Sequence, residues 1–391
     1  MVILPTRELA IQCYNMFLKF NQYIKLTSTV CIGKTDLSHQ EKALQGNPDI
    51  VFATPGRLVD ILTNTHGVIL EEVDFLVFDE ADKLLEMGFK SEVEEILKLC
   101  GYSNENRQVM LLSATLDKQI MRMGKLALKN PLFVESQVNK GIPQNLKQQI
   151  VKLKGVKCRE VRKAILLHLV DQNEGKKMII FFMTKRECHE VALLLKISGM
   201  EILELHGDLT QNTRLETLRN FAKEDSEYNI LLATDLAGRG LDFPLVDLVI
   251  NFDLVTDASK YVHRVGRTAR AGNAGECISL YDDEELLGFK KMGRKIMKGS
   301  KRKLRIEYLP VDFSQVKAKK FLISKMRKKV RVALKEEYAM RQLEKAEMEA
   351  TKARNLMEYK DQILARPKRE WIVSNKQREQ IREQYKKIKT S

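Results

Sequence analysis

Short apolar runs alternate with segments of helical character along the first 290 residues, and this alternation restricts the fold more than any other feature. Each run holds four to six residues and is rich in β-branched or aromatic side chains. Strands that alternate with helices in this way form parallel sheets whose faces the helices cover. We therefore expect an α/β fold, with strands at Ile50–Ala53, Phe75–Asp79, Val109–Ser113, Met178–Met183, Ile202–Leu205, Asn229–Thr234 and Leu248–Phe252.

The length and the turn-forming residues indicate two domains and an extension. A chain of 391 residues is long enough for two domains of about 150 residues and a remainder. The polar segment Asn139–Gln149 contains Gly141 and Pro143 and shows no hydrophobic period, which predicts an interdomain linker. We therefore expect the first domain at 1–138, the linker at 139–149, the second domain at 150–300 and a C-terminal extension at 301–391.

The extension contains a long segment without helix-breaking residues. Neither glycine nor proline occurs between Val311 and Arg366, and charged residues dominate, so the segment is predicted to be one long helix. We favour a helix that docks on its own domain or lies in solvent over a coiled-coil dimer, and we expect a monomer. The weak apolar seam along the helix consists of Leu343, Ala346, Ala350, Ala353, Met357 and Leu364, with a break at Lys360.

Composition restricts the partners and the compartment. The formal net charge of +15 indicates a polyanionic partner, although a basic solubilising tail would give the same excess. Six cysteines without a C-x-x-C pair argue against zinc sites and a disulfide framework, and favour a reduced intracellular compartment. No apolar run reaches the length of a membrane span, and the start of the chain lacks signal-peptide features. We therefore expect neither a membrane segment nor secretion.

The segment F-D-E-A-D at Phe78–Asp82 follows an apolar run that a buried strand would supply. Adjacent carboxylates at the end of a strand suit Mg²⁺ and an attacking water. Taken alone, such a cluster is more often a charged helix start or a solvated loop. Its interpretation therefore depends on the motifs around it.

Five further motifs accompany this segment in order along the chain. Together the six motifs resemble those of the DEAD-box RNA helicases over roughly the first three quarters of the chain. The resemblance implies two RecA-like parallel-sheet domains, the first incomplete at its N-terminus, and a long basic C-terminal helix. It also implies an enzyme that couples ATP hydrolysis to local RNA strand separation or remodelling of RNA–protein complexes, with ATP and Mg²⁺ as cofactors. The five motifs are P-T-R-E-L-A (Pro5–Ala10), T-P-G-R (Thr54–Arg57), S-A-T (Ser113–Thr115), A-T-D-L-A-G-R-G-L-D (Ala233–Asp242) and H-R-V-G-R-T-A-R-A-G (His263–Gly272).

The resemblance assigns the phosphoryl-transfer chemistry to acids of the first half and arginines of the second. Asp79 would hold Mg²⁺ through water, and Glu80 would orient or deprotonate the hydrolytic water. Arg267 and Arg270 would reach the γ-phosphate, so we expect acids and arginines to converge on one cleft when the domains close. The residues that would couple hydrolysis to RNA binding are Asp82, Ser113, Thr115 and His263.

The same resemblance assigns residues of both halves to the RNA backbone. Hydroxyls, helix-start amides and arginines suit phosphate oxygens and carry no base information, so binding should be independent of RNA sequence. Lys34 follows Gly33 where the family has two glycines, and Ala269 replaces a usual glycine. Asp235 and Asp242 match polar positions near the nucleotide. The RNA-backbone positions are Thr6, Arg7, Gly33, Thr54, Gly56, Arg57, Thr234 and Gly238.

The phosphate-binding pattern G-x-x-x-x-G-K-[ST] does not occur in the sequence. The one G-K-T, Gly33–Thr35, has Ser28 where the first glycine belongs. In the family the phosphate loop precedes P-T-R-E-L-A. We therefore expect the chain to be the C-terminal portion of a longer helicase, with little ATP hydrolysis on its own and a loosened first domain.

The end of the chain predicts a location. R-P-K-R-E-W at Arg366–Trp371, after a basic helix, resembles the tail of nucleolar family members that act in large-subunit rRNA processing and ribosome biogenesis. This implies a nuclear, nucleolar protein with pre-ribosomal RNA and pre-ribosomal proteins as partners. A non-catalytic RNA-binding or annealing module remains the main alternative, and a DNA translocase is disfavoured by the D-E-A-D and H-R-V-G-R-T-A-R motifs.

Overall fold

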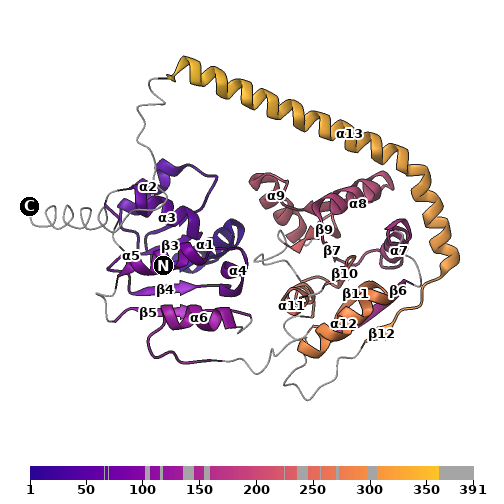
Figure 1. The fold of residues 1–391 in the computed structure, drawn as a ribbon, viewed down its shortest axis with the longest axis horizontal. Coiled ribbons are helices and arrows are strands. Elements are labelled where there is room, and N and C mark those ends of the chain that lie inside the picture. The colour runs from indigo at the N-terminus through magenta and orange to yellow at the C-terminus, as the bar shows by residue number, and fades with distance from the viewer. Residues whose placement is uncertain are drawn as a thin grey trace, which may run out of the picture. The chain divides into compact units, whose positions relative to one another are not determined.

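The computed structural model divides the chain into two compact units (Figure 1). The first consists mainly of Met1–Phe133, and the second mainly of Val134–Arg239 and Phe243–Tyr359. Each unit contains its own parallel sheet, so the predicted α/β fold with two parallel-sheet domains is confirmed. The structure describes residues 1–65, 67–68, 70–101, 106–114, 118–134, 145–153, 159–223, 225–235, 245–255, 257–269, 273–296 and 306–360.

The first unit has a five-stranded sheet in the order β2-β3-β1-β4-β5. The short strand β1 lies at its centre, where Val2 pairs with Phe52 on one side and Val77 on the other. Helices pack on this sheet, as is usual for parallel sheets, whose strands are joined by crossover helices. The strands are β1 Val2–Ile3, β2 Ser28–Cys31, β3 Ile50–Ala53, β4 Phe75–Phe78 and β5 Gln108–Leu111, and the helices are α1 Arg7–Asn21, α2 Leu37–Gln45, α3 Pro55–Asn64, α4 Ala81–Glu86, α5 Lys90–Cys100 and α6 Lys118–Ala127.

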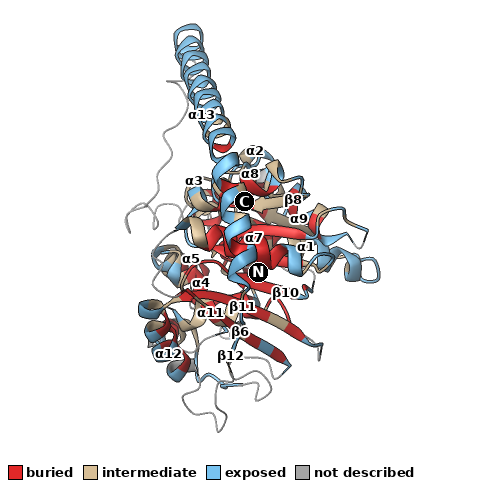
Figure 2. Ribbon diagram, turned by 90° about the vertical axis from the view of Figure 1, so that its right-hand side faces the viewer, coloured by how far each residue is buried: buried red, intermediate tan, exposed pale blue. Residues whose placement is uncertain are grey.

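The second unit has a seven-stranded parallel sheet in the order β12-β6-β11-β10-β7-β9-β8. Every residue of the central strands β10, β7 and β9 is buried, and Figure 2 shows strands of this sheet in red. The strands are β6 Leu146–Leu153, β7 Met178–Phe182, β8 Ile202–Leu205, β9 Ile230–Thr234, β10 Leu248–Asn251, β11 Gly275–Asp282 and β12 Glu307–Tyr308, and the helices are α7 Arg159–Gln172, α8 Lys185–Ile197, α9 Gln211–Ala222, α11 Ala258–Val265, α12 Asp283–Ile296 and α13 Phe313–Glu358.

The predicted long C-terminal helix is confirmed as α13. The Asp312 carboxylate caps its start by accepting from the backbone N–H of Ser314 at 2.9 Å. Val316, Ile323 and Val330, each seven residues apart, are buried in the core of the second unit, where α13 packs on α7 and α8. From residue 338 to 358 every side chain is exposed, and Figure 2 shows this length of the helix in pale blue. Among the described helices, none is long and apolar enough to cross a membrane.

A histidine on α8 links α13 to the second unit. Nδ1 of His189 lies 2.8 Å from Oε2 of Glu204 on β8, and Nε2 lies 2.5 Å from Oε2 of Glu337 on α13. Both ring nitrogens face carboxylate oxygens, an arrangement that favours the protonated ring, which donates a hydrogen bond from each nitrogen. The hydrogen bond to Glu204, and to a smaller extent Glu337, raises the pKa of His189 against the effect of burial. This ion pair therefore fastens the last docked turn of α13.

His206 extends the cluster, and its hydrogen bonds favour a hydrogen bond to Glu204 over metal binding. The ligand atoms of His189, Glu204 and His206 lie within 4.8 Å of one another, a spacing that could hold a metal ion. However, the backbone N–H of Asp208 donates to Nδ1 of His206, which leaves the proton on Nε2, the nitrogen that faces Glu204 at 3.3 Å. Lys196 lies 3.1 Å from the other oxygen of Glu204. Burial opposes ionisation of Glu204, but the two histidines and Lys196 lower the pKa of its carboxyl.

Raising the pH should loosen the docked end of α13. The unfolded-state pKa of a histidine is about 6.5, and the pKa of His189 is raised above its ordinary value in the folded protein. The stabilisation is therefore complete below about pH 6.5 and is lost as the pH rises through the folded-state pKa. Hydrogen exchange at residues 334–338, corrected for its intrinsic pH dependence, should accelerate by about two- to tenfold over that range. Glu337→Gln should diminish this acceleration and Glu336→Gln should not, whereas equal behaviour of both variants would contradict the role of His189.

Candidate functional site

The predicted RNA-backbone residues of the first unit come from three neighbouring strands. Thr6 follows β1, Gly33 follows β2 and Thr54 follows β3, and these strands lie side by side in the sheet. Because the strands are parallel, their carboxyl ends meet at one edge, the usual place for ligands in α/β sheets. The next strands along the sheet are β4, which leads into Asp79, and β5, which leads into Ser113. The order along this edge is therefore the residues predicted to bind the RNA backbone first and the acids next.

Two helices begin at this edge. The Thr6 hydroxyl caps α1 by accepting from the backbone N–H of Leu9 at 3.3 Å. Thr54 lies at the start of α3, and its hydroxyl makes no capping hydrogen bond to this helix. A Cβ built on Gly56, in the first turn of α3, would meet nothing within 4 Å, which leaves open space beside the helix start. Free N–H groups and the positive end of the helix dipole make such a start suitable for a phosphate.

Two arginines lie against the loop that follows β2. A Cβ built on Gly33 would lie 2.9 Å from Nη2 of Arg7, so the guanidinium packs directly on this glycine. Nη1 of Arg57 lies 3.3 Å from both the carbonyl oxygen of Thr35 and Oε1 of Gln40. Buried Gln40 in turn accepts from the N–H of Ile32 and donates to its carbonyl, each at 3.1 Å. Sequence reasoning missed Gln40, which fixes the loop that the two arginines contact.

The acid pair occupies a sharp turn at the end of β4. Glu80 has φ +48°, a left-handed conformation that is strained for a residue with a side chain. One carboxylate oxygen, Oε1, lies 2.5 Å from Nζ of buried Lys83, whereas Oε2 is buried without a hydrogen-bond partner in the described part of the chain. The N–H of Ala81 donates to the carbonyl of Leu112 at 2.9 Å, which joins this turn to the segment after β5. Lys83 was also missed, although its spacing of three residues from Glu80 on a helix is a recognisable signal.

The electrostatics of the pair fit a divalent cation. Burial, with smaller contributions from the carboxylates of Glu80 and Asp82, raises the pKa of Asp79 above its ordinary value. A nearby Mg²⁺ would reverse this effect by favouring the charged form. The unpartnered oxygen of Glu80 likewise fits a water molecule that needs an acceptor. Asp82 is buried on α4 and accepts from the backbone N–H of Lys83 at 3.2 Å.

In the second unit, predicted Asp235 forms a two-pronged ion pair with Arg264. Nε and Nη2 of Arg264 lie 2.5 and 2.8 Å from the two Asp235 carboxylate oxygens. Nη1 donates to Asn251 at 3.1 Å, and the guanidinium lies over the ring of Phe181 at 5.1 Å. Bidentate arginine pairs are strong and geometrically specific. The Asp235 carboxylate is therefore committed to orienting α11, through an arginine that sequence reasoning passed over.

The remaining predicted residues of this unit lie around α11. Arg267 is largely buried and donates from Nε to the carbonyl of His263 at 3.2 Å. Thr234 is buried at the end of β9, in register with Phe182. Ala269 has φ +56°, the left-handed region where a glycine would be unstrained. Four predicted site residues, Thr115, Gly238, Asp242 and Arg270, lie outside the described residues.

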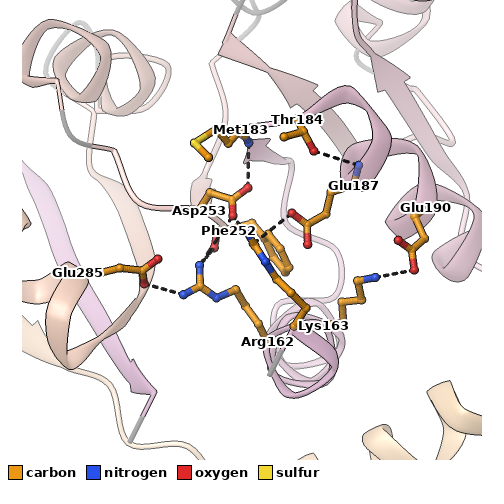
Figure 3. A network of polar contacts seen from close by, with 10 residues as sticks. Arg162, Lys163, Met183, Thr184, Glu187, Glu190, Phe252, Asp253 and Glu285 are labelled. Atoms are coloured by element: carbon orange, nitrogen blue, oxygen red, sulfur yellow. Dashed lines mark hydrogen bonds and ion pairs between the residues drawn. The ribbon is translucent and has the colours of Figure 1, made fainter. Parts of the chain in front are cut away.

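A buried network that sequence reasoning missed centres on Asp253, directly after β10 and Phe252 (Figure 3). One carboxylate oxygen accepts from the backbone N–H of Met183 at 2.8 Å, and the other pairs with Arg159 and faces Arg162 at 3.8 Å. Arg162 also donates to the carbonyl of Phe252 at 3.1 Å and to Glu285 at 2.5 Å. The network connects the ends of β7 and β10 to α7 and α12.

Comparisons with known proteins identify relatives over most of the chain. The family profile described as DEAD/DEAH box helicase matches residues 1–123, and the profile described as Helicase conserved C-terminal domain matches residues 160–272. The chain is 39% identical over 379 residues to DEAD-box ATP-dependent RNA helicase 28 of Oryza sativa subsp. japonica. This match covers 97% of this chain and 46% of that protein. It is 36% identical over 389 residues to ATP-dependent RNA helicase DRS1 of Candida glabrata, and this match covers 96% of this chain and 52% of DRS1. The chain thus spans about half the length of these curated relatives.

Solved structures of similar fold contain RNA and nucleotide. Mss116p bound to ssRNA and AMP-PNP is similar with a TM-score of 0.67 and 28% identity, over 80% of this chain and 64% of that one. Dbp5 of S. cerevisiae bound to RNA and ADP BeF3 is similar with a TM-score of 0.66 and 26% identity, over 84% of this chain and 81% of that one.

Proposed function

The chain belongs to the DEAD-box helicase family, and we propose that it forms the two helicase units of an ATP-dependent RNA helicase. In this role the first unit grips one RNA strand by its sugar–phosphate backbone, and ATP hydrolysis is coupled to local strand separation or remodelling of RNA–protein complexes. The observation that carries the proposal is the order of groups along one sheet edge. Phosphate-binding groups follow β2, β3 and β1, and the acid pair Asp79–Glu80 follows the adjacent strand β4.

The grip on RNA would come from the starts of α1 and α3 together with Arg7 and Arg57. These groups recognise phosphate oxygens, which every nucleotide presents, so binding is expected to be independent of sequence. The open space beside Gly56 would let a phosphate approach the N–H groups of α3. We assign Thr234 and Gly238 of the second unit to the same strand by their family positions.

The acids would carry out the hydrolytic part of the reaction. Mg²⁺ bound with ATP supplies charge neutralisation for phosphoryl transfer. Asp79 would hold the ion through water, and the free oxygen of Glu80 would accept a hydrogen bond from the attacking water and orient it. By their family positions, Arg267 and Arg270 would neutralise the γ-phosphate, and Asp235 and Asp242 would act near the nucleotide. Asp82, Ser113, Thr115 and His263 would couple hydrolysis to RNA binding.

The affinity of the full chain for single-stranded RNA, measured by fluorescence anisotropy, tests this proposal. Gly33→Ala should weaken binding by about tenfold because the added Cβ displaces the Arg7 guanidinium and its charge-assisted hydrogen bonds. The displaced group is the end of a flexible side chain, so the fold should keep its stability. Arg7→Ala should weaken binding equally, and the double variant should lose no more than Arg7→Ala alone.

Gly124→Ala is the matched control for this experiment. Its Cβ would meet only a side-chain atom of Leu128 at 3.7 Å, an ordinary contact, so this variant should bind RNA normally. Unchanged binding by both Gly33→Ala and Arg7→Ala would overturn the proposed grip on RNA. A non-catalytic RNA-binding module would show the same RNA contacts, but its affinity would not respond to ATP when a phosphate-binding loop is supplied.

We further propose a role in ribosome biogenesis, in large-subunit rRNA processing within the nucleolus. This rests on the R-P-K-R-E-W ending at Arg366–Trp371, which resembles nucleolar family members. Pre-ribosomal RNA and pre-ribosomal proteins would then be the partners. Cross-linking the tagged protein to cellular RNA checks this, because precursors of the large-subunit rRNA should dominate the bound fragments, and their absence would exclude the role.

A further inference from the structure

The first half of α13 carries a block of positive charge that contains no acid. Between Phe313 and Lys335 the helix has nine Lys or Arg residues and no Asp or Glu. Two of the nine face the second unit, where Lys319 pairs with Asp171 and Arg327 lies 2.8 Å from Glu160. The other seven are exposed and form no ion pair with a described residue. They are Lys317, Lys320, Lys325, Lys328, Lys329, Arg331 and Lys335.

The docking of the helix fixes the direction of these charges. Because Val316, Ile323 and Val330 are buried in the second unit, this length of α13 cannot turn about its own axis. At 3.6 residues per turn, five of the seven cations fall within a sector of roughly 80° on the exposed side and extend over about 27 Å. We call these five residues the basic stripe: Lys317, Lys320, Lys328, Arg331 and Lys335.

The stripe is electrostatically unfavourable without a partner. Neighbours three or four residues apart on a helix repel when they carry the same charge, as Lys328, Arg331 and Lys335 do. The exposed half of α13 is different, because residues 336–358 contain six acids interspersed with four bases. Interspersed positive and negative charges are typical of a helix that is simply exposed to solvent. The positively charged segment ends near residue 335, close to where α13 leaves the surface of the second unit. A bound polyanion would reduce the repulsion among its lysines and arginines.

An exposed aromatic side chain lies beside the stripe. Phe321 is 62% exposed, and Nζ of Lys325 lies 4.5 Å from the centre of its ring. Cations that follow a backbone, combined with an aromatic face on which a base can stack, are typical of surfaces that bind single-stranded nucleic acid. An acidic protein segment would use the charges, but it would leave Phe321 without a specific role.

We propose that the basic stripe and Phe321 form a second RNA-binding surface, carried by the second unit and separate from the residues that follow β1, β2 and β3. It binds the backbone of single-stranded RNA without regard to sequence and retains RNA independently of the helicase motifs. The inference rests on the proposed function only for the identity of the polyanion as RNA. The surface requires no nucleotide and no change of fold.

The test measures binding of the full chain to a single-stranded RNA as a function of salt concentration. The stripe variant combines Lys320→Gln, Lys328→Gln, Arg331→Gln and Lys335→Gln. Each phosphate contact on a single strand contributes about 0.7 to the slope of log affinity against log salt, so the variant should lower the slope by about 2–3. Affinity at low salt should fall at least tenfold. The matched control places the same charge change in the exposed half of the helix, with Arg341→Gln, Lys345→Gln, Lys352→Gln and Arg354→Gln, and should change the slope by less than about 1.

Two further measurements separate the possible outcomes. Phe321→Ala should weaken RNA binding with the salt slope unchanged, because stacking releases no counterions. Repeating the stripe experiment in an Arg7→Ala background distinguishes this surface from the first-unit site. If the two surfaces are separate, the stripe substitutions should weaken RNA binding further in the Arg7→Ala protein. If the stripe variant keeps the wild-type slope and affinity, the proposal is wrong. It is equally wrong if the variant loses only binding to poly-glutamate, which would assign the stripe to acidic protein segments.

Discussion

Replacing Asp253 with alanine should destabilise the second unit by about 3–5 kcal/mol. Asp253 is only 2% exposed, and its removal leaves the N–H of Met183 without an acceptor. Arg159 and Arg162 each lose one carboxylate partner and keep only Glu187 and Glu285, respectively, as described carboxylate partners. Buried donors and charges that lose a partner are costly because the surroundings cannot solvate them. Hydrogen exchange of the amides in β7 and β10 measures the effect for this unit alone, and it should accelerate by about 10²- to 10⁴-fold.

Two variants of the same network calibrate this prediction. Asp253→Asn keeps an acceptor for the Met183 N–H and should lose less stability than alanine. Glu190→Gln breaks the ion pair with Lys163. Because the Glu190 side chain is 40% exposed, this variant should lower the stability of the unit by less than about 1 kcal/mol. If Asp253→Ala cost no more than Glu190→Gln, the buried network would not be a stabilising element of the unit.

Replacing Glu80 with glutamine should lower RNA-stimulated ATP hydrolysis by about 10²- to 10⁴-fold. The sequence contains no G-x-x-x-x-G-K-[ST], so the assay uses a polypeptide that joins a family phosphate-binding loop to residues 1–391. Glutamine keeps an acceptor for Lys83 but removes the negative charge that would orient and deprotonate water. RNA affinity, measured on the same protein, should change by less than about twofold, since the residues proposed to bind phosphate follow other strands.

The control for this prediction is Glu86→Gln at the exposed end of the same helix, α4. It makes the same chemical change away from the acid pair and should leave hydrolysis near the wild-type rate. Equal hydrolysis by Glu80→Gln and Glu86→Gln would remove Glu80 from the reaction. A parallel loss of RNA binding in Glu80→Gln would instead indicate a damaged fold.

The sequence predicted strands that are continuous apolar runs, among them β7, β9 and β10, in which every residue is buried. All seven predicted strands are present. β3 and β8 have the predicted bounds, and the other five have ends that differ by one or two residues; Met178–Met183, for example, is observed as β7 at Met178–Phe182. Strands with weaker patterns were missed. β1 has only two residues, and β6 interrupts its apolar positions with Lys147, Gln148 and Gln149. Their places in the sheets depend on neighbours that are distant in the sequence.

Site residues could be predicted where the interacting residues belong to one sequence motif. They could not be predicted where the partner is distant in the sequence. Asp79 and Glu80 are adjacent in the sequence and follow a strand, so their place at the sheet edge could be inferred. The pairing of Asp235 with Arg264 joins residues 29 positions apart, and Arg162 reaches Phe252 over 90 positions. No periodicity of a single sequence records such contacts, which arise only when strands and helices pack.

Amide chemical shifts of the full chain on titration with single-stranded RNA test the central claim most directly. Recording them in the stripe variant removes the contribution of α13. The proposed RNA-binding edge predicts that the largest changes occur at residues 6–8, 33–35 and 54–57, at the ends of β1, β2 and β3. Binding without changes at these three segments would contradict the assignment of this sheet edge to RNA.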